Sequence, residues 1–189
     1  MSDEKILCAG FGGQGIMSLG KLLAYSGMLA GKQVTWMPSY GPEMRGGTAY
    51  CSVVVSDKPV GSPIVTSHAT SLIVMNLPSF DKFEHSVTSG GLIVMNSSLI
   101  DRKSSREDVT VYGVKANDLA AQCGNPRAAN MIMLGTYMAL KGEPRLEHVV
   151  KALKKVFEIR SSALIDLNID TLRCGMDLVT MPTEPRQAA

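Results

Sequence analysis

KILCAGFGGQGI, at residues 5–16, is the stretch of sequence that decides the fold. Residues 5–9 predict a short buried strand, and a helix is expected to begin at Ile16 after a glycine-rich break. Gly10, Gly12 and Gly15 have the G-x-G-x-x-G spacing of a strand–turn–helix motif. Such a turn lets a ligand or another chain approach bare backbone at the N-terminus of a helix.

The usual ligand of this motif is a dinucleotide pyrophosphate, but the sequence that follows argues against it. A dinucleotide site needs an acid at the end of the second strand, roughly 20 residues past the glycines, to hold the ribose hydroxyls. This chain has VTWM at residues 34–37, and the first acid to follow is Glu43. A free-standing nucleotide- or flavin-binding oxidoreductase domain therefore remains only an alternative, supported by the glycine motif alone.

A second glycine-rich stretch, MPSYGPEMRGGT at residues 37–48, follows soon after the first. Gly46 and Gly47 permit a positive φ or a very close neighbour. Glu43 and Arg45 lie between the glycines, and two interpretations stay open. They could form a surface ion pair worth about 0 to 1 kcal/mol, or Arg45 could bind a carboxylate or phosphate through both arms of its guanidinium.

The candidate cofactor-binding residues come from these two loops and from one polar side chain on an otherwise apolar helix. They are Gly12, Gly13, Gln14 and Gly15, then Tyr40, Gly41, Pro42, Glu43, Arg45, Gly46 and Gly47, and Asn130. No catalytic residue is assigned, because neither loop pairs a nucleophile or base with a group that would tune its pKa.

Hydrophobic patterning predicts a three-layer α/β/α fold around a mainly parallel, mixed sheet of Rossmann-like type. Strands are expected at 5–9, 34–37, 49–56, 64–66, 71–75, 92–95 and 109–114, and helices at 16–30, 79–87, 117–122, 127–141, 146–157 and 162–178. Pro38 is expected to stop the second strand, and Ser79 to cap the second helix. No repeat or linker is present, so residues 1–189 form one domain, with a frayed tail at 182–189.

Three segments carry further expectations. Residues 101–108, DRKSSRED, are the most polar stretch and predict a solvated loop. The helix at 127–141 is apolar on every side, which indicates either a central helix or one at an interface. Asn76 and Asn96 each end an apolar strand, where an open α/β sheet binds ligands, although Asn is also a common turn residue.

Composition excludes several classes of function. The net charge is +2 and no basic block exceeds Lys154-Lys155, which argues against a nucleic-acid partner. The N-terminus lacks signal-peptide character, and no apolar run approaches the ~18–20 residues of a membrane span, so a cytoplasmic protein is expected. The 4 cysteines and 3 histidines are scattered without ligand spacing, and therefore no metal site is assigned. Cys8 and Cys51 are expected to be buried thiols.

Four motifs together resemble the gamma subunit of 2-oxoacid:ferredoxin oxidoreductases. They are GFGGQGI at residues 10–16, SYGPEMRGGTA at 39–49, SDKPVGSP at 56–63 and NMIMLG at 130–135, and the resemblance covers roughly residues 5–160. The sequence WMPSYGPEMRGG, at residues 36–47, is most similar to the corresponding motif in the branch of the family that acts on 2-oxoglutarate or branched-chain 2-oxoacids. The chain departs from the family at residues 67–70, SHAT, where members carry an Ala-Asp or Pro-Asp pair, so the role of that Asp is in doubt here.

The resemblance implies a subunit of an enzyme that oxidatively decarboxylates a 2-oxoacid, with 2-oxoglutarate expected, to an acyl-CoA and passes electrons to ferredoxin. Thiamine diphosphate and Mg²⁺ would be carried by alpha and beta subunits, and [4Fe-4S] clusters by beta or delta. The present chain would hold no cofactor tightly, would pack on those subunits beside the coenzyme A side of the active site, and would be inactive alone. When isolated, it could also self-associate. A purely structural scaffold subunit is the remaining alternative.

Overall fold

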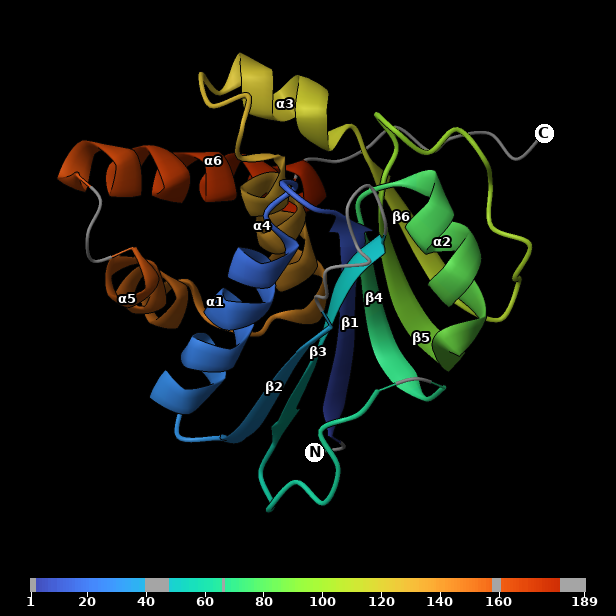
Figure 1. Ribbon diagram of the computed structural model, residues 1–189. Coiled ribbons are helices and arrows are strands. Elements are labelled where there is room, and N and C mark those ends of the chain that lie inside the picture. The colour runs from blue at the N-terminus through green and yellow to red at the C-terminus, as the bar shows by residue number, and fades with distance from the viewer. Residues whose placement is uncertain (1–2, 40–47, 66, 158–160, 181–189) are drawn as a thin grey trace.

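The computed structural model describes residues 3–39, 48–65, 67–157 and 161–180, which form a six-stranded mixed sheet with helices on both faces (Figure 1). This architecture confirms the predicted α/β class. The strands are β1 (Glu4–Phe11), β2 (Gln33–Ser39), β3 (Thr48–Ser56), β4 (Ala69–Val74), β5 (Val87–Asn96) and β6 (Thr110–Val114). The helices are α1 (Ile16–Leu29), α2 (Leu77–Phe83) with the 3₁₀ turn η2 (Glu84–Ser86), α3 (Ala116–Gln122), α4 (Ala129–Lys141), α5 (Leu146–Val156) and α6 (Ser162–Thr180).

The strand order is β2-β3-β1-β4-β5-β6, with β1 near the centre. Strands β1, β4, β5 and β6 pair in parallel, whereas β3 pairs antiparallel with both β1 and β2. The hairpin formed by β2 and β3 therefore extends one side of an otherwise parallel sheet. Parallel strands covered on both faces are expected to be apolar throughout, and residues 6–9 of β1 are accordingly all buried.

Each face of the sheet has its own core. Ile6 and Cys8 of β1 point into a core shared with α1, α3, α4, α5 and α6, whereas Leu7 and Ala9 point into a second core with α2. Figure 1 shows this division, with α1, α5 and α6 on one side of the strands and α2 on the other. The helices that follow β1 and β4 thus leave the sheet toward opposite faces.

Helix α4 is the central helix that its composition suggested, because all of its residues from Ala129 to Met138 are buried. It crosses α6 with backbone against backbone. A Cβ at Gly135 would overlap the Leu172 carbonyl, and a Cβ at Gly175 would overlap the Ile132 carbonyl. The two glycines therefore permit a helix contact that any larger residue would open.

Several predicted boundaries are wrong for identifiable reasons. Ile64 and Val65 form no strand, because both edges of β3 are already paired with β1 and β2. Pro38 does not end β2, since an edge strand tolerates a residue without an N–H group. Asn76, rather than Ser79, caps α2 by accepting a hydrogen bond of 2.9 Å from the Ser79 N–H. Residues 182–189 lie outside the described residues.

The four cysteines form two kinds of pair. Cys8 and Cys51 are free, fully buried and directly opposite each other in the β1–β3 ladder, which confirms the prediction of buried thiols. Cys123, at the end of α3, and Cys174, in α6, form a disulfide that the sequence did not reveal. Their separation of 51 residues means that only the fold brings them together.

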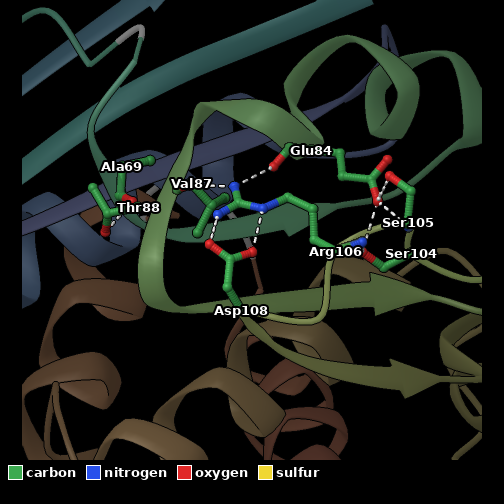
Figure 2. Close-up of polar contacts among 8 residues, drawn as sticks. All are labelled: Ala69, Glu84, Val87, Thr88, Ser104, Ser105, Arg106 and Asp108. Carbon is green, nitrogen blue, oxygen red and sulfur yellow. Dashed lines mark hydrogen bonds and ion pairs between the residues drawn. The ribbon is translucent and has the colours of Figure 1, made fainter.

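The polar segment 101–108 is a mostly exposed loop, as predicted, but it is also fixed against α2 and η2 by polar contacts with Glu84. Glu84, whose side chain is only 1% exposed, accepts hydrogen bonds from Ser104 Oγ at 2.6 Å and from the Ser105 N–H at 2.7 Å. Arg106 bonds both carboxylate oxygens of Asp108 and donates to the Val87 carbonyl (Figure 2). A buried carboxylate therefore organises a segment that its composition assigns to solvent.

Burial alone would raise the pKa of Glu84, but the surrounding donors prevail. Hydrogen bonds from Ser104, Arg102 and the Ser105 N–H, together with the charge of Arg102, lower the pKa of Glu84 from 4.5 to about 2. A carboxyl group whose pKa is lower in the folded chain stabilises the fold above pH 4.5. That contribution is lost as the pH falls from 4.5 toward 2.

We therefore expect the wild-type free energy of unfolding to fall by about 2 kcal/mol more than that of Glu84→Gln between pH 6 and pH 3, because only the carboxylate is protonated. Urea unfolding followed by circular dichroism at each pH measures the difference. Asp101→Asn, at an exposed position on the same segment, is the control and should show the wild-type dependence. Parallel curves for wild type and Glu84→Gln would contradict the assignment.

Candidate functional site

The glycine turn (residues 12–15) joins β1 to α1, and two of its glycines are required by backbone conformation. Gly13 has φ 91° and Gly15 has φ 77°, in the left-handed region that disfavours other residues. Gln14 closes the turn, because its N–H donates to the Phe11 carbonyl at 3.2 Å and its Oε1 accepts from the Phe11 N–H at 2.6 Å. The turn is thus fixed by one side chain folded back on the strand it leaves.

The turn lies at the carboxyl ends of β1 and β4, where the helices after the two strands depart to opposite faces of the sheet. Open α/β sheets bind ligands at such a switch point. Gln14 Oε1 also accepts a hydrogen bond of 3.1 Å from Asn76 Nδ2, which ties the turn to the end of β4. Asn76 was not among the candidate residues, although its place at the end of an apolar strand was the signal that could have identified it.

Asn96 performs a similar task one strand further along. Its Nδ2 donates to the Met75 carbonyl and to Asn117 Oδ1, and its Oδ1 accepts from the N–H groups of Ser98 and Ala116. These bonds join the carboxyl ends of β4, β5 and β6. The interpretation of Asn76 and Asn96 as turn-forming residues is therefore correct, and both support the edge on which the glycine turn lies.

Asn130 is brought to the glycine turn by α4, as its assignment to the candidate site requires. Its Nδ2 donates to the Gly15 carbonyl at 3.3 Å, and a Cβ at Gly15 would overlap its amide. Neither α1 nor α4 has a side-chain cap or an acid in its first turn. Two helix N-termini, each with a partial positive charge, therefore approach the same turn, and neither has an acidic residue in its own first turn to neutralise it.

Gly12 differs from the other glycines of the turn. It has no positive φ, and a Cβ built on it would meet no described atom within 4 Å. Among the described residues, the N–H groups of Gly12, Gly13 and Gly15 also have no hydrogen-bond acceptor. The fold of the described residues does not require glycine at position 12, and the turn leaves backbone donors available to a partner or ligand.

The second glycine-rich loop connects β2 to β3. Ser39 ends β2 and Thr48 begins β3, and Thr48 pairs directly with Phe11 at the start of the glycine turn. Both flanks of the loop therefore lie at the same end of the sheet as the turn. The candidate residues within it, Tyr40, Gly41, Pro42, Glu43, Arg45, Gly46 and Gly47, lie outside the described residues.

The sheet topology argues against the dinucleotide alternative. In a dinucleotide-binding fold the acid that holds the ribose comes from a strand next to the first one. Here β3 lies between β1 and β2, so the end of β2 is two strands away, about 10 Å at the usual spacing. The described part of β2 also contains no acid.

Two other classes of site were sought in the same residues. Across the described ranges, no three His, Cys, Asp or Glu side chains lie close enough together to hold a metal ion. None of the described helices has the length and hydropathy needed to cross a bilayer. The described part of the site therefore consists of backbone donors, the amides of Gln14, Asn76 and Asn130, and two helix N-termini, which suit an anion better than a metal.

Comparison with known proteins identifies sequence relatives. Residues 5–178 match the family described as pyruvate ferredoxin/flavodoxin oxidoreductase. Ketoisovalerate oxidoreductase subunit VorA of Methanothermobacter marburgensis is 39% identical over 177 residues, which are 93% of this chain but only 36% of VorA. 2-Oxoglutarate synthase subunit KorC of Methanocaldococcus jannaschii is 32% identical over 153 residues, which are 79% of this chain and 81% of KorC. The chain thus spans about a third of VorA and most of KorC.

Solved structures give the same picture. The gamma subunit of a keto/oxoacid ferredoxin oxidoreductase from Geobacter sulfurreducens PCA superposes with a TM-score of 0.79 at 26% identity, covering 94% of this chain and 98% of that one. A 2-oxoglutarate:ferredoxin oxidoreductase from Magnetococcus marinus, with 2-oxoglutarate, coenzyme A and succinyl-CoA bound, superposes over the whole chain and 33% of its own. Its TM-score is 0.84 at 22% identity, which shows a shared fold.

The geometry of the turn predicts that substitutions of its glycines change the free energy of unfolding by different amounts. Gly15→Ala should lower the free energy of unfolding by about 2 kcal/mol or more, because it combines a left-handed φ with overlap of Asn130. Gly12→Ala should change it by no more than about 0.5 kcal/mol. Urea unfolding of the isolated chain measures both. In an Asn130→Ala background part of the Gly15→Ala loss should be recovered; an equal loss in both backgrounds would refute the packing account.

Proposed function

Because the chain belongs to the pyruvate ferredoxin/flavodoxin oxidoreductase family, we propose that it is the gamma subunit of a 2-oxoacid:ferredoxin oxidoreductase. In the proposed reaction, a 2-oxoacid, coenzyme A and two oxidised ferredoxins give an acyl-CoA, carbon dioxide, two reduced ferredoxins and a proton. KorC, which this chain matches over most of its length, supports a separate subunit of this kind.

The proposed partners are the chains that the family resemblance implies. Alpha and beta subunits would carry thiamine diphosphate and Mg²⁺, and beta or delta would carry the [4Fe-4S] clusters that pass electrons to ferredoxin. Thiamine diphosphate, bound by those subunits, supplies the decarboxylation chemistry. The substrate would be 2-oxoglutarate or a branched-chain 2-oxoacid, since the relatives are named for both.

We assign the glycine turn to the coenzyme A side of the active site. The diphosphate of coenzyme A is an anion of the kind that helix N-termini and free backbone N–H groups bind. The N-termini of α1 and α4 meet at this turn without caps, and Gly12 leaves room for a group to approach the backbone. Arg45, in the adjacent loop, would add a bidentate donor for phosphate.

The observation that carries this assignment is that no described residue lies against Gly12. Gly13 and Gly15 are explained by their φ angles and Gly15 also by Asn130, but nothing described within the chain explains a glycine at position 12. Contact with a ligand or with a neighbouring subunit gives that residue a reason. No group at the turn can act as a nucleophile or base, so this chain would position coenzyme A and exclude water rather than react.

We expect Gly12→Leu and Arg45→Ala to raise the KM for coenzyme A in the assembled enzyme by about tenfold, because each weakens binding of the diphosphate by about 1.4 kcal/mol. The KM for the 2-oxoacid should stay within about twofold. Steady-state assays with ferredoxin or a viologen dye measure both constants.

Gly61→Leu is the matched control, because Gly61 also has open space and no positive φ but lies outside the turn. It should leave both constants unchanged. An unaltered KM for coenzyme A in Gly12→Leu and Arg45→Ala would indicate a scaffold subunit instead. Turnover of a 2-oxoacid by the single purified chain would contradict the proposal as a whole.

A further inference from the structure

A groove of about 490 Å³ lies between helix α1, helix α5 and the edge strand β2. Its floor is apolar and includes Trp36 of β2 and Val156 of α5. Lys21 on α1 and Lys155 on α5 line it as well. The residues that form it are separate from the glycine turn, and the function proposed above uses none of them.

The positive charge of this groove is not neutralised within the described residues. Lys21 forms no ion pair there and instead lies with its Nζ 5.2 Å from the centre of the Trp36 ring. Lys155 likewise has no ion pair among those residues, nor have its neighbours Lys151 and Lys154 on α5. An occupant of the groove would therefore meet cations that no carboxylate of the described residues neutralises.

A smaller hollow at the amino end of β1 shows the opposite condition. It has a volume of about 250 Å³, and its charged side chains are already paired, Glu4 with Lys141 and Lys32 with Asp57. A charged ligand there would have to displace an internal ion pair. The α1–α5 groove imposes no such cost, which makes it the stronger candidate for a contact.

Exposed apolar side chains extend the groove along α1. Met28 is 59% exposed, Leu29 47% and Tyr25 37%, although all three are large hydrophobic side chains. Tyr25 and Met28 line the groove, and Leu29 follows in the chain. A small molecule in the groove would leave much of this surface in water, whereas a protein segment would cover it.

We infer that this groove is the docking site for an acidic, amphipathic segment of the thiamine-binding partner subunit, with an apolar side chain against Trp36 and carboxylates facing Lys21 and Lys155. The inference rests on the proposed function. The inference is supported by VorA, because the part of VorA that matches this chain makes up only 36% of that polypeptide and is covalently joined to the rest. A separate chain must replace that covalent link with an interface. A second copy fits less well, because symmetric contact of this face with itself opposes lysines to lysines.

The test uses this chain purified with its alpha and beta partners, and zero-length carbodiimide cross-linking followed by mass spectrometry. Cross-links from Lys21 and Lys155 to partner Asp or Glu residues are expected. Lys21→Glu/Lys155→Glu should weaken assembly about tenfold or more, with a reduced dependence on salt concentration. Met28→Asp should also weaken it, by adding a carboxylate to an apolar contact.

Lys103→Glu is the control, since Lys103 is exposed on segment 101–108, which is fixed against α2 on the opposite face of the sheet, and it should assemble as wild type. Normal assembly of both groove variants would overturn the inference and leave the proposed function standing. Protection of Lys21 and Lys155 in a dimer of the isolated chain would assign the groove to a second copy and also overturn it. Failure of the wild-type chain to assemble with any thiamine-dependent partner would contradict the proposed function itself.

Discussion

The structure depends on one constraint, which is that the chain must reverse from β1 into α1 at the edge of a sheet buried on both faces. The four residues of the glycine turn accomplish this, with Gly13 and Gly15 in the left-handed region and Gln14 folded back on Phe11. The same Gln14 oxygen also accepts from Asn76, which fastens the turn to the end of β4, the strand that pairs in parallel with β1. The helices that follow β1 and β4 begin at these strand ends and pack on opposite faces of the sheet.

The two ends of the sheet differ in how their polar groups are satisfied. At the amino end, Glu4 accepts hydrogen bonds from Ser71 and Tyr137 and pairs with Lys141, so its carboxylate is fully used within the chain. At the carboxyl end, the N–H groups of the glycine turn and the first turns of α1 and α4 lack side-chain partners among the described residues. The amino end is therefore satisfied by its own side chains, whereas the carboxyl end keeps backbone donors without a side-chain partner among the described residues.

The sequence predicted those elements whose formation depends on interactions between residues close together in the chain. The glycine spacing, the apolar runs of β1 and β4 and the all-apolar α4 each correspond to an element that forms as expected. What the local sequence missed depends on distant partners: residues 64 and 65 pair with no strand of the sheet, and segment 101–108 is anchored by Glu84, some twenty residues earlier in the chain. The distinction between Gly12 and Gly15 was also hidden, because it requires the position of Asn130, 115 residues away.

Helices α4 and α6 touch through their backbones at Gly135 and Gly175, and at the same crossing Thr136 Oγ1 of α4 donates a hydrogen bond of 3.0 Å to the Gly175 carbonyl. This contact leaves little room for α4 and α6 to move against each other. The amino end of α4 carries Asn130, whose Nδ2 donates to the Gly15 carbonyl. Close-packed interiors transmit displacement, so a shift of α6 against α4 is expected to reach Asn130. A methyl group added at either crossing glycine would separate the two helices and disturb the hydrogen bond between Asn130 and the glycine turn, because Ile132, which Gly175 contacts, lies only two residues after Asn130.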